Sequence, residues 1–345
     1  MEDDEAPRSQ FAATSTIDHQ PSTLVVQTAF LGDVVLTTPL LAALAEQYGP
    51  VDVVTTPGAA ALLETHPAVH RVIRHDKHGA ARGVRGVLAL AEAIRAGGYT
   101  RAYLPHQSWR SGLGTWLAGV PERVGFADAP ARWSYTHRVS KPAGVHETER
   151  LLALADRVGA TKPTLGLTSA DHGAAIAWLE THSVGGRFVA VAPGSVWGTK
   201  RWGKYPQLAA ALDLDVVIIG GPEDGPLAET IVSAAPRAQS AVGALPLRAS
   251  AALIARAAAL VTNDSLPLHL AQATGTPTVA IFGPTVPAFG YGPTGARDRV
   301  VEVQGLVCRP CSTHGPMRCP LGHHRCMADL DVLQVMAALT DILID

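Results

Sequence analysis

The chain has 345 residues, of which 47% are apolar, with 28 lysines and arginines against 30 aspartates and glutamates. This length predicts about two domains with ample cores, and the low charged fraction of 17% excludes a disordered chain or a coiled coil. The net charge of −2 excludes a basic field over the whole molecule. We therefore expect no nucleic-acid partner, and any bound anion must be held by a local site.

The first residues carry no targeting pattern. Residues 1–21 open with the acidic run Met1-Glu2-Asp3-Asp4-Glu5 and lack the apolar stretch of a secretory signal, so a disordered leader is expected there. No apolar run approaches the roughly 18 residues that a membrane helix needs. This predicts a cytoplasmic protein, and peripheral contact with a membrane through an amphipathic surface stays open.

Short β-branched runs alternate with stretches of helical periodicity from Leu24 onward. The first half predicts strands over 24–28, 51–55, 70–73, 101–105 and 123–126, and helices over 34–48, 84–96 and 109–118, with a turn at 31–33. The pattern weakens between about 160 and 186. It then predicts strands over 188–192, 215–219, 260–262 and 278–282, and helices over 205–212, 224–234, 247–258, 266–274 and 329–345.

Strands that alternate with helices predict parallel sheets covered on both faces. We therefore expect an α/β fold of two Rossmann-like, doubly wound domains that face a central cleft. The expected organisation is a leader over 1–21, an N-terminal domain over 22–165, a C-terminal domain over 166–328 and a terminal helix over 329–345. Ligands of open α/β sheets bind beyond the carboxyl ends of the strands, so residues that follow strands are the candidates for function.

Asp33 follows the first predicted strand and directly precedes the first predicted helix. One interpretation is structural, because an aspartate at this place often caps the helix. The other is a general base that points into the cleft, where burial would tune its pKa.

Two segments of the second half combine polar residues with predicted strand ends. Residues 192–202 mix glycines and hydroxyls with Lys200 and Arg201, a composition suited to a phosphate, although a plain surface loop has it too. Residues 263–269 place Asp264 or Ser265 at the start of a helix, where amides and the helix dipole attract anions. Simple capping is the alternative there.

A third strand-end turn, 220–224, carries Glu223, whose carboxylate is placed to accept hydrogen bonds from a ribose or a base. All four cysteines lie within residues 308–326, as Cys308, Cys311, Cys319 and Cys326. Such clustering predicts either a structural zinc or iron site, or reduced thiols or a disulfide. Both interpretations stay open, because the second half of the cluster, C-x6-C, is looser than in a zinc ribbon.

Together these segments resemble glycosyltransferase family 9, the ADP-heptose:lipopolysaccharide heptosyltransferases, and are similar to the heptosyltransferase II branch. The resemblance runs from about Leu24 to the end of the chain. It is carried by LGDVVLTTPLLAAL (31–44), APGSVWGTKRW (192–202), IIGGPED (218–224), NDSLPLHLAQATGTPTVAIFGPT (263–285) and CPLGHHRC (319–326). It implies a GT-B fold and inverting transfer of heptose from ADP-heptose to a hydroxyl of a glycan, the lipopolysaccharide inner core.

The resemblance also assigns roles to residues. It makes Asp33 the catalytic base and Lys200 the cationic ligand of the leaving diphosphate, which together require no metal cofactor for catalysis. The donor-binding residues that it implies are Ser195, Thr199, Lys200, Glu223, Asp264, Ser265 and His269. One departure is Leu266, where the family often has glycine; Pro267 follows it, so the amides that contact phosphate stay open.

The acceptor side is less defined. A lipopolysaccharide core carries carboxylates and phosphates, so Trp109 and Arg110, after a strand of the first half, are the predicted acceptor-binding residues, with a solvated surface arginine as the alternative. A protein O-heptosyltransferase, another GT-B nucleotide-sugar enzyme and a non-catalytic, metal-organised binding subunit remain alternative functions. A lipopolysaccharide acceptor would bring the protein to the inner face of the cytoplasmic membrane.

Overall fold

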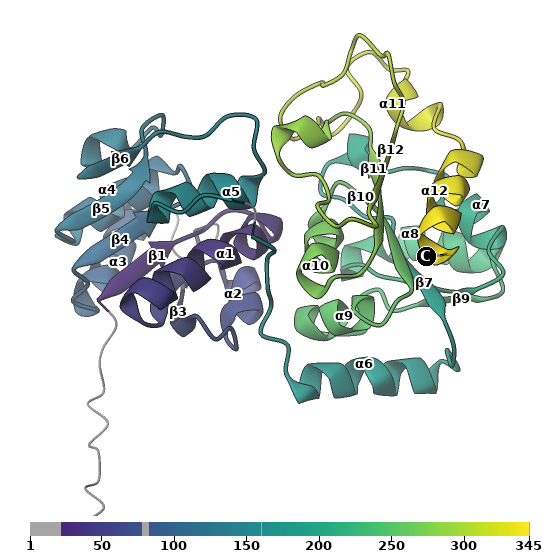
Figure 1. Ribbon diagram of the computed structural model, residues 1–345, viewed down its shortest axis with the longest axis horizontal. Helices are drawn as coiled ribbons and strands as arrows, with labels where there is room; N and C mark the ends of the chain where they lie inside the picture. Colours follow the sequence, from purple (N-terminus) through teal and green to yellow (C-terminus); the bar gives the residue numbers. More distant parts are fainter. Residues whose placement is uncertain (1–21, 78–82, 160, 345) are drawn as a thin grey trace, which may run out of the picture.

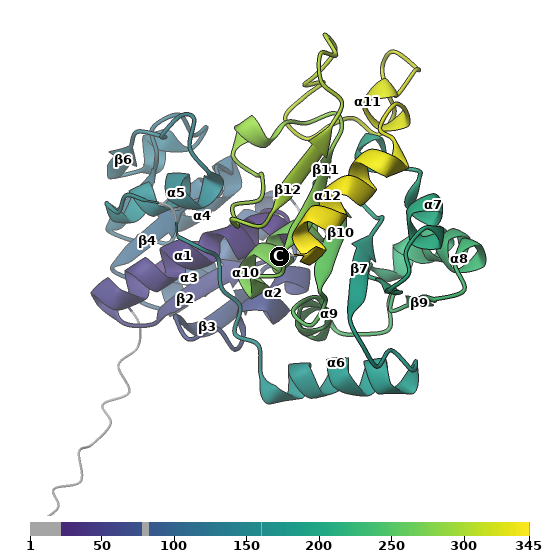
Figure 2. The same ribbon diagram turned by 45° about the vertical axis from the view of Figure 1, so that its right-hand side comes forward.

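The computed structural model describes residues 22–77, 83–159 and 161–344. The leader predicted over 1–21 and the last residue of the predicted terminal helix lie outside these ranges. The described chain forms two lobes, each built on a six-stranded parallel sheet with helices on both faces (Figures 1 and 2). The predicted α/β class is confirmed.

The first sheet has the strand order β3-β2-β1-β4-β5-β6. Its central strand β1 pairs with β2 and β4, so that Val25 lies beside Val53 and Tyr103. The strands are β1 (Thr23–Val26), β2 (Val51–Thr55), β3 (Val69–Arg74), β4 (Arg101–Leu104), β5 (Glu122–Phe126) and β6 (His137–Val139). The helices are α1 (Leu31–Tyr48), α2 (Pro57–Leu63), α3 (Gly83–Ala96), α4 (Trp109–Leu117) and α5 (Glu147–Leu152).

The second sheet repeats this topology, with the order β12-β11-β10-β7-β8-β9. The strands are β7 (Phe188–Ala192), β8 (Asp215–Ile218), β9 (Ala238–Ser240), β10 (Ala259–Asn263), β11 (Thr278–Phe282) and β12 (Arg299–Glu302). The helices are α6 (Ser169–Thr181), α7 (Tyr205–Ala210), α8 (Gly225–Ala234), α9 (Leu247–Ile254), α10 (Leu266–Thr274), α11 (Arg325–Ala328) and α12 (Val332–Ile344). In each sheet the order reverses at one place, between β1 and β4 and between β7 and β10.

Sequence and structure agree best where an apolar run is continuous. The strands predicted over 51–55, 188–192 and 278–282 are β2, β7 and β11, and all of their residues are buried, as a strand covered on both faces requires. The turn predicted at 31–33 is wrong, because α1 begins at Leu31. The elements that were not predicted are β6, β9, β12, α2, α5, α6 and α11.

Helix α1 passes through Pro39, whose missing N–H leaves the Val35 carbonyl without its helical partner. The hydroxyl of Thr38 donates to that carbonyl at 2.8 Å, and the oxygen of this hydroxyl accepts the N–H of Thr164 at 2.9 Å. The chain between the lobes is thus tied to α1.

The two lobes also meet through helices. Helix α1 of the first lobe contacts α10 of the second, and α2 of the first lobe contacts α9 of the second. Among the residues described, none of the helices combines the length and apolarity that a bilayer crossing requires.

Candidate active site

One cavity of about 820 Å³ lies where the carboxyl ends of both sheets face each other. Its lining comes from both lobes and includes the stretches 30–33, 194–197, 220–224 and 264–267. These stretches follow β1, β7, β8 and β10, so the strands at both reversals of strand order contribute. This is where open α/β sheets bind their ligands.

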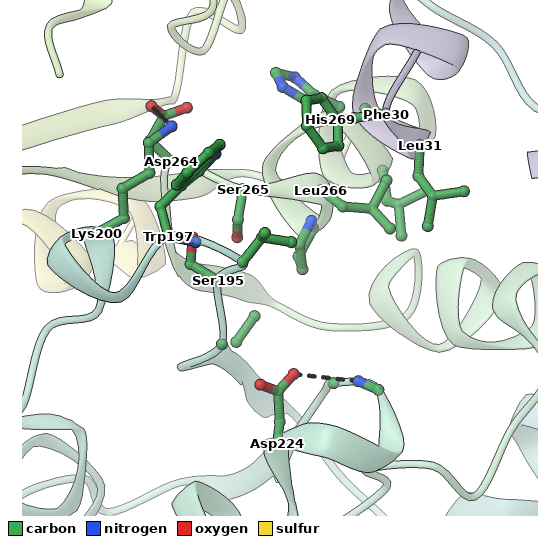
Figure 3. A pocket seen from close by; sticks show the side chains of 18 of the residues that line it. Phe30, Leu31, Ser195, Trp197, Lys200, Asp224, Asp264, Ser265, Leu266 and His269 are labelled. Atoms are coloured by element: carbon green, nitrogen blue, oxygen red, sulfur yellow. Dashed lines mark hydrogen bonds and ion pairs between the residues drawn. The ribbon is translucent and has the colours of Figure 1, made fainter. Parts of the chain in front are cut away.

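The predicted catalytic and donor-binding residues gather on this cavity, with Thr199 as the exception. The lining contains Asp33, Ser195, Lys200, Glu223, Asp264, Ser265 and His269. Figure 3 shows the Lys200–Asp264 pair on one side of the view and Phe30, Leu31 and His269 on the other.

Asp33 is the third residue of α1, and Phe30 is the N-cap. Its carboxylate accepts the N–H of Phe30 at 3.2 Å and also lines the cavity. Capping the first turn and facing the cavity are therefore properties of the same side chain. Burial raises the pKa of Asp33, and the nearby His269, the Phe30 N–H, His314 and Lys77 partly offset that rise. A carboxylate with a raised pKa is a better proton acceptor, as a general base needs to be.

His269 is buried on α10, and its Nδ1 lies 2.9 Å from Oε1 of Gln272. Because Gln272 donates its own NH2 group to the Gly292 carbonyl at 3.0 Å, its oxygen is the acceptor and His269 Nδ1 the donor. Burial lowers the pKa of His269, which favours the neutral imidazole over the imidazolium. Its Nε2 then carries a lone pair that can accept a hydrogen bond.

Lys200 and Asp264 form a buried ion pair with an Nζ–Oδ2 distance of 2.6 Å. The same carboxylate oxygen accepts the hydroxyl of Thr285 at 2.7 Å. These bonds hold the ammonium group at the wall of the cavity before any ligand binds. A fixed cation in a partly dehydrated site is suited to a diphosphate.

The start of α10 lies next to this ion pair, because Ser265 directly follows Asp264. Ser265 is the N-cap, but its hydroxyl makes no capping bond and instead donates to the carbonyl of Asn263 at 3.4 Å. Pro267 contributes no N–H, and Leu268 N–H is bonded to the Ser265 carbonyl. The positive end of the α10 dipole nevertheless faces the cavity, since 264–267 line it.

Thr199 does not line the cavity. Its hydroxyl donates to the carbonyl of Pro316 at 2.5 Å, and its N–H reaches the same oxygen at 3.3 Å. Thr199 therefore anchors the cysteine-rich segment (residues 308–326) in this structure, and its predicted place among the donor-binding residues stays a prediction. Local composition around Lys200 gave no sign of this long-range contact.

The turn after β8 is built around Asp224, which sequence analysis missed. Its buried carboxylate accepts the N–H of Gly221 at 3.2 Å, and a Cβ on Gly194 or Gly220 would lie 2.3 or 2.7 Å from its oxygens. The glycines of both turns are therefore needed for close packing on Asp224. Burial and the charge of Glu223 raise the pKa of Asp224.

Glu223 is exposed at the edge of the same turn and lines the cavity next to an apolar slot. The slot is made by Ile219, Leu245 and Leu247. Apolar side chains of this kind are suited to a flat aromatic base, while the carboxylate of Glu223 can accept bonds from ribose hydroxyls. In the sequence, only Leu245 and Leu247, shortly after β9, indicate this slot.

The predicted acceptor residues, Trp109 and Arg110, lie outside the lining of the cavity, at the start of α4. The guanidinium of Arg110 stacks 5.1 Å from the centre of the Trp109 ring. Lys77, which was not predicted, interacts electrostatically with both Arg110 and Asp33; its pKa is lowered by burial and by Arg110, and raised by Asp33. Lys77 also donates to the carbonyl of Thr28 at 2.5 Å.

The four cysteines are free thiols. Cys326 is buried, Cys311 is exposed, and Cys308 and Cys319 are partly exposed. Within the described ranges no three His, Cys, Asp or Glu side chains are placed to hold a metal ion. The four thiols are nevertheless close enough to interact electrostatically, and a structural zinc or iron site at them stays a prediction.

Comparisons with known proteins match this architecture. The family model described as glycosyltransferase family 9 (heptosyltransferase) matches residues 87–319. A lipopolysaccharide heptosyltransferase 2 of Escherichia coli K12 is 27% identical over 311 residues, which cover 81% of this chain and 87% of that protein.

Two solved structures share the fold. The glycosyltransferase family 9 structure from Veillonella parvula has a TM-score of 0.82 at 23% identity, covering 94% of this chain and 98% of that one. The E. coli ADP-heptose lps heptosyltransferase II has a TM-score of 0.76 at 25% identity, with the same coverage. The GT-B architecture implied by the resemblance is confirmed.

Proposed function

The chain belongs to glycosyltransferase family 9, the heptosyltransferase family, and we propose that it transfers heptose from ADP-heptose to a hydroxyl of the lipopolysaccharide inner core. The observation that carries this proposal is one cavity lined by a carboxylate of raised pKa, Asp33, and by a fixed cation, Lys200, from opposite lobes. The donor is supported by the related enzyme whose name specifies ADP-heptose.

In the proposed reaction, Asp33 takes the proton of the acceptor hydroxyl. The acceptor oxygen then bonds to the anomeric carbon, while the bond from that carbon to the diphosphate oxygen breaks with both electrons leaving on ADP. Attack from the face opposite the leaving group inverts the configuration. Lys200 and the positive end of the α10 dipole stabilise the charge that develops on the diphosphate.

The donor is expected to lie with its base in the slot beside Leu245 and Leu247, its ribose on Glu223 and its diphosphate on Lys200. This order leaves the sugar nearest Asp33. The apolar slot does not by itself distinguish adenine from another base, so the preference for ADP is tested with a panel of nucleotide sugars.

A glycan acceptor is favoured over a protein acceptor because the relative from E. coli K12 is named a lipopolysaccharide heptosyltransferase. Arg110 and Lys77 supply positive charge on the first lobe for the anionic groups of such a glycan. A lipid-anchored acceptor also implies contact with a membrane surface, which co-sedimentation with vesicles that contain the acceptor would test.

The deciding experiment incubates the protein with ADP-heptose and heptose-deficient lipopolysaccharide, and records the product by mass spectrometry. We expect a mass increase of one heptose with the wild-type chain, and none with Asp33→Asn. Transfer from UDP- or GDP-sugars in preference to ADP-heptose would overturn the donor assignment. Heptose on a protein, with none on the glycan, would overturn the acceptor assignment.

A further inference from the structure

The cysteine-rich segment is not explained by the chemistry above, yet it reaches the cavity. Several bonds fasten it to the second lobe. They include Thr199 hydroxyl to Pro316 carbonyl at 2.5 Å, Cys311 N–H to Pro284 carbonyl at 2.9 Å, and His324 Nε2 to Thr199 carbonyl at 2.8 Å. The segment therefore has a defined position beside residues 192–202, the phosphate-side loop that carries Lys200.

This position brings His314 into the lining of the cavity. The next residue, Gly315, is buried and has a φ of +78°. A Cβ there would lie 2.9 Å from Pro284 Cγ and 3.2 Å from Thr199 Oγ1. Only glycine fits both this conformation and this space, so Gly315 sets the direction in which His314 leaves the backbone.

Three rings from three separate segments meet at this point. The His314 ring lies nearly parallel to that of Trp197, with 6.0 Å between centroids and 11° between planes. It meets Phe30 edge-on, with centroids 6.3 Å apart. Phe30 belongs to the first lobe and is 55% exposed, so a large apolar face is left open inside the cavity.

The backbone N–H groups of Phe30 and Trp197 show which residues adjoin the rings. Phe30 N–H is bonded to the carboxylate of Asp33, and Trp197 N–H is bonded to the hydroxyl of Ser195 at 3.3 Å. The rings therefore link the start of α1, which carries Asp33, to the loop that carries Trp197 and Lys200, and His314 is close enough to Asp33 to affect its pKa. In a transfer reaction, the group between the base and the diphosphate is the sugar itself.

We propose that Phe30, Trp197 and His314 form a wall that holds the transferred sugar of the donor, with His314 as its polar contact. A sugar ring presents C–H groups on its faces and hydroxyls on its edge. Aromatic rings bury the C–H face, and an imidazole nitrogen hydrogen-bonds a hydroxyl. No described residue hydrogen-bonds to the His314 ring, so its nitrogens are available to a ligand. The proposal rests on the proposed function, because it assigns the sugar of that donor.

Calorimetry with two ligands tests the wall. ADP carries every part of the donor except the sugar, so His314→Ala should leave the Kd for ADP within two-fold, and weaken binding of ADP-heptose about ten-fold, the loss of one hydrogen bond and part of a ring contact. His314→Gln keeps a hydrogen-bonding group and should recover part of the loss. Met317→Ala is the matched control, because Met317 is 59% exposed on the same segment and its side chain does not line the cavity; it should bind both ligands as the wild type does.

A second variant moves His314 without removing it. Gly315→Ala should also weaken ADP-heptose selectively, because the added Cβ has no room. Unchanged ADP-heptose affinity in a folded His314→Ala chain would overturn the wall, and so would an equal loss of ADP and ADP-heptose. A wild-type chain that binds neither ligand would instead overturn the proposed function, which keeps the two failures distinct.

Discussion

Gly32 of α1 and His269 of α10 approach each other so closely that a Cβ on Gly32 would lie 2.7 Å from Cδ2 of His269. The contact joins the two lobes one residue before the proposed base. His269 has little freedom to withdraw, because Gln272 holds its Nδ1 and the ring is buried. The glycine of the Leu-Gly-Asp motif is thus explained by packing between lobes.

Gly32→Ala is therefore expected to shift α1 and displace Asp33. Alanine is the better helix former by up to about 1 kcal/mol, which offsets the cost of the close contact with His269. The thermal midpoint should therefore change little, while kcat/KM falls about ten-fold or more. Gly58→Ala in α2 is the matched control, because a Cβ there meets no atom within 4 Å. Full activity of Gly32→Ala would show that the lobes do not need this approach.

Asp33→Asn separates the base from the cap. The amide oxygen can still accept Phe30 N–H, so the fold and the ADP affinity should persist, while kcat falls by about 100-fold or more. Kinetics with purified acceptor, alongside ADP calorimetry, measure the two effects. Retention of more than a tenth of the wild-type kcat would exclude Asp33 as the base.

The raised pKa of Asp33 gives a pH dependence with a defined sign. Transfer by the wild type should decline as the pH falls through this raised value, so the acidic limb of the rate profile lies above the ordinary carboxyl pKa of 3.8. A folded-state pKa above the unfolded one means that the ionised group destabilises the fold above that pH. Asp33→Asn should accordingly unfold at the same or a higher temperature at neutral pH, and the difference should vanish below pH 3.8.

The geometry of parallel sheets explains which parts of the site could be predicted from the sequence. Strands β2, β7 and β11 are apolar throughout because they are covered on both faces, and the residues after such strands necessarily share one edge. This placed Asp33 and Lys200 on one cavity. Strands β6 and β9, with three residues each, are too short for any periodicity.

The remainder of the site depends on contacts between segments far apart in the chain. Thr199 lies in a loop whose composition is suited to a phosphate, but its hydroxyl donates to the carbonyl of Pro316, 117 residues away. His314 reaches the cavity only because of that anchor and of Gly315. No local pattern encodes the position of Thr199 or that of His314, so neither could be predicted from the sequence.

Lys200→Ala tests the cation and its partner together. Lys200 and Asp264 side chains are only 11% and 9% exposed, so removing the lysine leaves a buried carboxylate supported by Thr285 alone. We expect a loss of about 3 kcal/mol in the free energy of unfolding and a weaker Kd for ADP. Adding Asp264→Asn should restore stability without restoring ADP affinity. If Lys200→Ala binds ADP like the wild type, Lys200 is not a diphosphate ligand.

Arg110→Ala tests the acceptor side. Arg110 lies near Lys77 and outside the donor cavity, so the KM for the acceptor should rise several-fold, more at low than at high salt, with an unchanged Kd for ADP-heptose. Arg256→Ala is the control, since this exposed arginine follows α9 in the second lobe. An equal KM for both variants would show that Arg110 is a solvated surface arginine and does not bind the acceptor.

The cysteine-rich segment yields a test of the metal interpretation by alkylation. Backbone N–H groups, that of His324 first, lower the pKa of the Cys319 thiol, whereas burial raises that of Cys326 to about 11. Thiolates are the reactive form, so limited iodoacetamide at pH 8 should modify Cys319 first and Cys326 last, as read by peptide mass spectrometry. EDTA should not change this order, because it follows from the pKa values of the thiols. EDTA should not change the rate of transfer either, because Asp33 and Lys200 supply the charges that the reaction needs. Four equally protected thiols that EDTA exposes, with one metal ion per chain by elemental analysis, would instead establish a structural metal site.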